Sequence, residues 1–165
     1  MKNEITGMKL RLIVMNFLQF AVWGAYLTSM GTYLFNIGLG AKIGLFYAMQ
    51  GIVSLFMPAI MGIIADRWVP AQKLYGFCHF MAAVFMVAAG WYGYVDGEAV
   101  NFGTLFTFYS LSVAFYMPTL ALTNSVAYTA LDKVKLDPVI AFPPIRIFGT
   151  IGFICSMLLT DILGF

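Results

Sequence analysis

Apolar residues gather in five long stretches of this chain, separated by short polar segments. The stretches cover residues 10–37, 43–65, 74–94, 102–131 and 144–165. A helix of about 20 apolar residues crosses about 30 Å of hydrocarbon. The stretches lack the strict alternation of barrel strands, and a helix satisfies its own backbone hydrogen bonds in lipid. The pattern therefore predicts an all-α integral membrane protein with five transmembrane helices.

Composition narrows the class of protein further. Hydrophobic residues make up 62% of the 165 residues and charged residues 10%, whereas soluble domains average about 45–50% and about 25%. This excludes an ordinary soluble fold and makes membrane lipid a partner of the chain. The net charge of +2 is too small to indicate a nucleic-acid partner.

Lysine and arginine residues concentrate in alternate loops. Seven would lie on one side of the membrane: Lys2, Lys9, Arg11, Arg67, Lys73, Lys133 and Lys135. The other side would carry Lys42 with the acidic Asp96 and Glu98. Because cytoplasmic loops are enriched in basic residues, we expect the amino terminus in the cytoplasm. The fifth stretch then runs outward to Phe165, and we expect the sixth helix to be missing from a truncated chain.

The loop after the second stretch carries Gly62, Asp66, Arg67 and Lys73. Gly62 would allow close approach of another helix, and Asp66 at a helix end opposes the dipole and would need a compensating partner. An ordinary charged loop explains these residues equally well. The spacing resembles the signature loop of the major facilitator superfamily, which helps control alternating access, but departs from it at residues 70–71.

Three residues of the last stretch would share one helical face. Arg146, Thr150 and Phe153 are spaced i, i+4 and i+7. A guanidinium, a hydroxyl and a ring can bind a polar ring compound. The alternative is that Arg146 reaches the headgroups while the other two side chains pack. A cation in the first helical turn would face the positive end of the dipole, which favours binding.

Nearby residues suggest how this last helix begins and packs. Pro144 suits a first helical position, where its missing N–H has no cost. Gly149 and Gly152 would let a neighbouring helix come close. We therefore expect the helix to begin near Pro144 and to contact another helix closely.

The first stretch carries a second polar and aromatic stripe. Asn16, Gln19, Trp23 and Tyr26 fall within about a quarter turn of a helix. Unpaired amides are not tolerated against lipid, so this face should point inward. Contact with another helix and contact with a solute both fit, and Gln19 and Trp23 are our candidates for solute binding.

Catalytic and metal-binding patterns are not found in the sequence. The single His79 and the separated Cys78 and Cys155 do not form a metal site, a triad or a phosphate loop. We therefore predict that the protein is not an enzyme and has no catalytic residues, metal or cofactor.

Four segments carry a resemblance to a known family: residues 17–24, 56–66, 116–120 and 142–153. Together, and in the same order, they resemble the nucleoside:proton symporter family, the bacterial nucleoside permeases of the major facilitator superfamily. The resemblance implies a twelve-helix transporter in two six-helix halves. This chain would be most of the amino-terminal half, in a bacterial inner (cytoplasmic) membrane.

The resemblance also implies the cargo. In the family, the arginine, threonine and phenylalanine of the last segment contact the nucleoside, and they match Arg146, Thr150 and Phe153. The resemblance further implies that protons are the coupling ion, and that most of the residues that couple proton movement to transport lie in the carboxy-terminal half. Two alternatives stay open: a facilitator for another polar metabolite such as a sugar, and a helical membrane module that serves subunit assembly.

Overall fold

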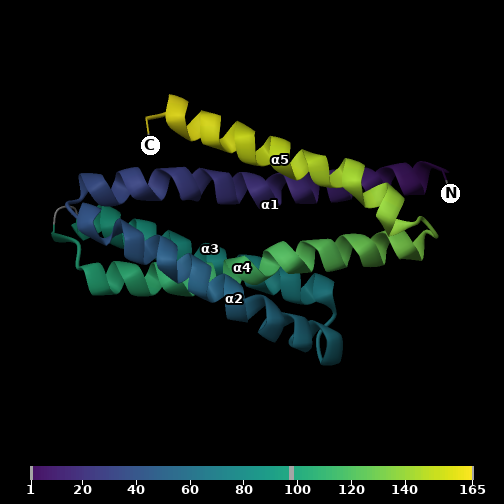
Figure 1. Cartoon of the computed structure of the whole chain (residues 1–165), viewed down its shortest axis with the longest axis horizontal. Helices are drawn as coiled ribbons and strands as arrows, with labels where there is room; N and C mark the ends of the chain where they lie inside the picture. Colours follow the sequence, from purple (N-terminus) through teal and green to yellow (C-terminus); the bar gives the residue numbers. More distant parts are fainter. Residues whose placement is uncertain (1, 97–98, 165) are drawn as a thin grey trace. The chain divides into compact units, whose positions relative to one another are not determined.

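The computed structural model describes residues 2–96 and 99–164, with side chains from Glu4 onward. It contains five long helices, coloured along the chain in Figure 1. They are α1 (Lys2–Asn36), α2 (Ile43–Arg67), α3 (Ala71–Asp96), α4 (Phe102–Lys133) and α5 (Pro138–Ile162), with a short 3-10 helix, η1 (Gly40–Lys42), before α2. Glu98 and Phe165, which were part of the predicted loop and of the fifth apolar stretch, lie outside the described residues.

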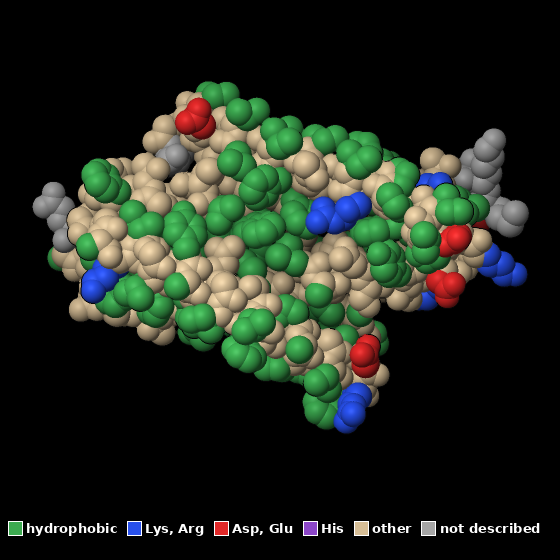
Figure 2. Space-filling view, in the orientation of Figure 1, with side chains coloured by type: hydrophobic (Ala, Val, Ile, Leu, Met, Phe, Trp, Pro, Cys, Tyr) green, Lys and Arg blue, Asp and Glu red, His purple; other side chains and the backbone are tan. Residues whose placement is uncertain are grey.

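All five long helices are long and apolar enough to cross a membrane. Several extend beyond the apolar stretches, most clearly α1, which begins at Lys2 instead of Leu10. An apolar stretch marks only the part of a helix that lies in the hydrocarbon core of the membrane. The helix itself can continue into the headgroup layer. Figure 2 shows a surface of mainly hydrophobic and uncharged atoms, with the charged side chains mostly near helix ends.

The start of α5 corrects the expectation that Pro144 takes the first helical position. Asp137 caps the helix in an extended conformation, and its side chain accepts a hydrogen bond from the Val139 N–H at 2.9 Å. Pro138 then occupies the first turn, where a proline loses no hydrogen bond. Arg146 consequently lies beyond the first turn, where the helix dipole has little effect. The expectation that Arg146 lies in the first helical turn is therefore wrong, and the helix dipole gives no reason to favour solute binding at Arg146.

The helices form two compact units. The first comprises Met1–Thr32 and Thr123–Phe165, and the second comprises Tyr33–Leu122. In the second unit, α2, α3 and α4 enclose a core of Met61, Leu74, Cys78 and Leu122. Ser112 of α4 donates a hydrogen bond to the Ala82 carbonyl of α3 at 2.7 Å, which ties two apolar helices together at a polar point.

The first unit brings together α1, the end of α4 and α5. Its buried core contains Leu12 from α1, Ala127 and Leu131 from α4, and Phe142 and Ile145 from α5. Segments from both ends of the chain thus share one core. This core holds in place the helix face on which the predicted binding residues lie.

Close packing of α5 on α1 confirms the expectation for the two glycines. A Cβ at Gly149 would lie 2.6 Å from Cδ2 of Phe20, and a Cβ at Gly152 would overlap the Phe17 carbonyl oxygen. Gly24 of α1 also has no room for a side chain, because a Cβ there would lie 2.7 Å from the Phe153 carbonyl oxygen of α5. Small residues therefore let the two backbones meet side by side, as Figure 1 shows.

Candidate functional site

A small pocket opens between α1 and α5 within the first unit. Its volume is about 170 Å³, and its lining residues are Phe20, Trp23, Arg146, Thr150 and Phe153. Four of these five were candidates from the sequence. The crossing of the two helices at small residues places the stripe of α1 beside the face of α5.

Arg146 is held against α1 through an aromatic contact. The carbon at the centre of its guanidinium lies 3.9 Å from the centre of the Phe20 ring. This distance is well within the range of a cation–π interaction. In the described part of the chain, the guanidinium has no carboxylate partner and no side-chain hydrogen bond. Its five N–H donors therefore remain available to a solute.

Aromatic and hydroxyl groups complete the pocket. The rings of Trp23 and Phe153 meet edge to face, with centroids 5.7 Å apart and planes at 67°. Thr150 is exposed, and its hydroxyl has no hydrogen-bond partner among the described residues. The pocket thus offers a fixed cation, a free hydroxyl and ring surfaces, which suit a polar compound with a flat ring.

Gln19, a candidate for solute binding, lies buried between helices and outside the pocket. Its side chain is 1% exposed, and its Oε1 accepts a hydrogen bond from the Thr123 hydroxyl at 3.2 Å. The contact joins α1 to α4 within the first unit, and Gln19 does not line the pocket. Of the two functions left open for the α1 stripe, contact between helices describes Gln19, while Trp23 lines the pocket.

The residues of the candidate gating loop lie at the end of α2, in the second unit. Asp66 and Arg67 are both exposed. Asp66 makes no ion pair with Arg67 or Lys73 in the described part of the chain, so the expected compensation is not seen. Close packing at Gly62 is not seen among the described residues either, because a Cβ there would meet nothing within 4 Å. The close approach of another helix to Gly62 stays a prediction.

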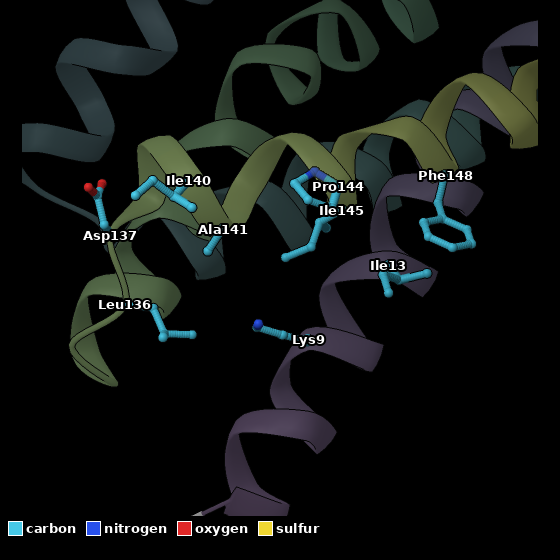
Figure 3. A pocket seen from close by; sticks show the side chains of 9 residues that line it. All are labelled: Lys9, Ile13, Leu136, Asp137, Ile140, Ala141, Pro144, Ile145 and Phe148. Atoms are coloured by element: carbon cyan, nitrogen blue, oxygen red, sulfur yellow. The ribbon is translucent and has the colours of Figure 1, made fainter.

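A second, larger pocket lies on a different face of α5. It measures about 460 Å³, and most of its lining is aliphatic. Figure 3 shows the Lys9 amine projecting between α1 and α5, while the Asp137 carboxylate points away from it. No hydroxyl lines this pocket, so it lacks the neutral donor that the pocket with Arg146 provides.

Phe20 is the site residue that sequence reasoning missed. It lies three positions before Trp23, so the helical period already placed both on one face of α1. The period alone did not reveal that Arg146 would lie on its ring. That contact depends on which helices pair, and the periodicity along a single helix does not specify helix pairing.

Comparison with known proteins identifies the family to which the sequence is similar. The family model for the nucleoside H+ symporter matches residues 6–164. Xanthosine permease of Escherichia coli (strain K12) is 42% identical over 150 residues, covering 90% of this chain and 34% of that protein. Nucleoside permease NupG of the same organism is 40% identical over 162 residues, covering 96% and 37%. The chain thus spans about a third of the length of these curated relatives.

Solved structures give the same result for the fold. The crystal structure of nucleoside transporter NupG matches this chain with a TM-score of 0.83 at 39% identity, covering 96% of this chain and 38% of that chain. The likeness confirms the predicted fold class, a multi-pass helical part of a transporter of the major facilitator type. The relatives are named permeases and transporters, in agreement with the prediction that the chain is not an enzyme. The chain belongs to the nucleoside H+ symporter family.

Proposed function

We propose that this chain supplies the α1 and α5 side of the solute site in a transporter that takes up nucleosides together with protons. The observation that supports this most is the convergence of Trp23, Arg146, Thr150 and Phe153 on one pocket. Arg146 and Thr150 would donate hydrogen bonds to sugar hydroxyls or base carbonyls. The two rings would stack on the base.

The size of the pocket supports a shared site. Complete ligand pockets measure about 300–1,000 Å³, and this pocket holds about 170 Å³. The matched relatives are nearly three times longer than the part that this chain covers. We propose that helices of a carboxy-terminal half close the pocket from the other side, and that relative movement of the halves exposes it to each face of the membrane in turn.

Proton coupling is proposed to involve groups outside the pocket. No carboxylate or histidine is among its lining residues. A coupling group must bind and release a proton within the working pH range, and a guanidinium stays protonated there. We therefore assign none of the pocket residues to proton transfer.

Uptake by the complete transporter tests the proposed cargo. Cells that make the protein should accumulate labelled nucleoside, and collapse of the proton gradient should abolish the accumulation. Unlabelled nucleosides should compete, whereas hexoses and pentoses should not. Competition by a free sugar but not by a nucleoside would instead support the alternative of a sugar facilitator.

We also propose that the loop after α2 faces the cytoplasm and moves during transport. Its basic residues fit the enrichment of cytoplasmic loops, and Asp66 and Arg67 are exposed for contact with other helices. In a protein without Cys155, the variant Gln72→Cys should react with an impermeant maleimide only from the cytoplasmic side, and nucleoside should change the rate. Ala41→Cys should react only from outside. The reverse pattern would overturn the orientation, and a constant rate would argue against loop movement.

A further inference from the structure

We propose that Phe20 is a positioning residue: its ring holds the guanidinium of Arg146 at the mouth of the solute pocket, and Gly149 leaves the space for this contact. The inference deepens the proposed function, on which it rests. As one of the lining residues, Phe20 would simply contact the solute. The inference gives Phe20 a second role, in which it acts on the solute through Arg146.

The first support is the geometry of the contact itself. The guanidinium lies 3.9 Å from the ring centre, so the ring face receives the cation. Phe20 is only 7% exposed, and the packing of α1 therefore fixes its ring. A buried ring is a rigid platform, whereas an unsupported arginine side chain would sample many conformations.

The second support is the space at Gly149. A Cβ there would lie 2.6 Å from Cδ2 of Phe20 and 2.8 Å from Nη1 of Arg146. The ring and the guanidinium thus occupy the place that any side chain at 149 would take. The absence of a side chain is a condition of the contact, in addition to its effect on the approach of the two helices.

The third support is that nothing else described fixes Arg146. The guanidinium has no ion pair or side-chain hydrogen bond in the described part of the chain. Fixing an arginine side chain in one conformation costs rotamer entropy. If Phe20 already orders the side chain, binding of a solute does not incur that cost again. The contact between Phe20 and Arg146 should therefore increase the affinity of the transporter for the solute.

The experiment uses the complete transporter and two readouts. Nucleoside affinity is measured for Phe20→Leu, which removes the ring, and for Phe20→Tyr, which keeps it. From the usual strength of a cation–π contact, we expect Phe20→Leu to raise Kd about 2- to 30-fold. We expect Phe20→Tyr to remain within about twofold of the parent. In an Arg146→Ala background, Phe20→Leu should have no further effect, because Phe20 acts through Arg146.

The second readout does not need a nucleoside. Modification of Arg146 by phenylglyoxal, followed by mass spectrometry with the exposed Arg11 as reference, should become several-fold faster in Phe20→Leu. The matched control is Phe17→Leu, the same change on the same helix at a side chain that does not line the pocket. It should leave both readouts unchanged.

The outcomes separate the two proposals. If the parent binds no nucleoside but Arg146 still reacts faster in Phe20→Leu, the proposed function fails and the positioning role stands. If Phe20→Leu leaves the reactivity of Arg146 unchanged, the positioning role is overturned. The same holds if Phe20→Leu weakens affinity equally with and without Arg146, because Phe20 would then act only through packing.

Discussion

Replacement of Arg146 by alanine is expected to weaken nucleoside binding and uptake by about 10- to 150-fold. Hydrogen bonds to a charged group contribute about 1.5–3 kcal/mol each, and the free guanidinium is the one cation that lines the pocket with Phe153. The loss should appear mainly as a higher Kd and KM. Labelled nucleoside binding to the purified transporter measures it.

Two further variants separate charge from geometry. Arg146→Lys keeps the cation but loses the planar fork of donors, so it should recover only part of the affinity. Arg11→Ala removes the same charge from an exposed position of α1 outside the pocket and should bind normally. Normal binding by Arg146→Ala would remove this residue from the solute site. An equal loss in Arg11→Ala would point to a general effect of charge.

Gly152→Ala is expected to destabilise the protein, although alanine is the better helix former. The added Cβ would overlap the backbone carbonyl of Phe17, and backbone atoms cannot move aside as a flexible side chain can. Overpacking of this kind costs about 1–3 kcal/mol. The unfolding temperature of the purified protein in detergent should fall, and Gly152→Leu should lower it further.

Gly76→Ala is the matched control for this effect. Gly76 is also inside a helix, α3, but a Cβ there would meet nothing within 4 Å. The change should be neutral or raise stability by up to about 1 kcal/mol, because alanine has the higher helix propensity. Gly152→Ala should therefore lower the unfolding temperature, whereas Gly76→Ala should leave it unchanged or raise it. A shift of the same size and sign in both would contradict the close crossing of α1 and α5.

Hydrophobic stretches identified the five helices well, because lipid requires long apolar helices whatever their partners. Helix ends were harder to predict. The pair Pro143–Pro144 led to a predicted start of α5 that is too late in the sequence. The helix begins at Pro138, after the capping residue Asp137. Recognition of Asp137 as a preferred capping residue would have shown that the helix begins before the proline pair.

Spacing along single helices predicted most of the site. Arg146, Thr150 and Phe153 share a face because of the helical period, and Trp23 joins them from α1. Gln19 and Phe20 show what the period cannot determine. Gln19 bonds with Thr123 of α4, and Phe20 lies under Arg146 of α5. Both outcomes depend on helix pairing, which arises from packing of distant segments and not from local pattern.

The most direct test of the central claim concerns the surroundings of Thr150. In a protein with Cys155 replaced by serine, the variant Thr150→Cys should react with a water-soluble maleimide, and nucleoside should slow the reaction while a sugar should not. Ile151→Cys, one residue further and about 100° around the helix, should resist the same reagent because its side chain would face lipid. Labelling of Thr150→Cys that nucleoside does not slow, or resistance equal to that of Ile151→Cys, would contradict a solute pocket between α1 and α5.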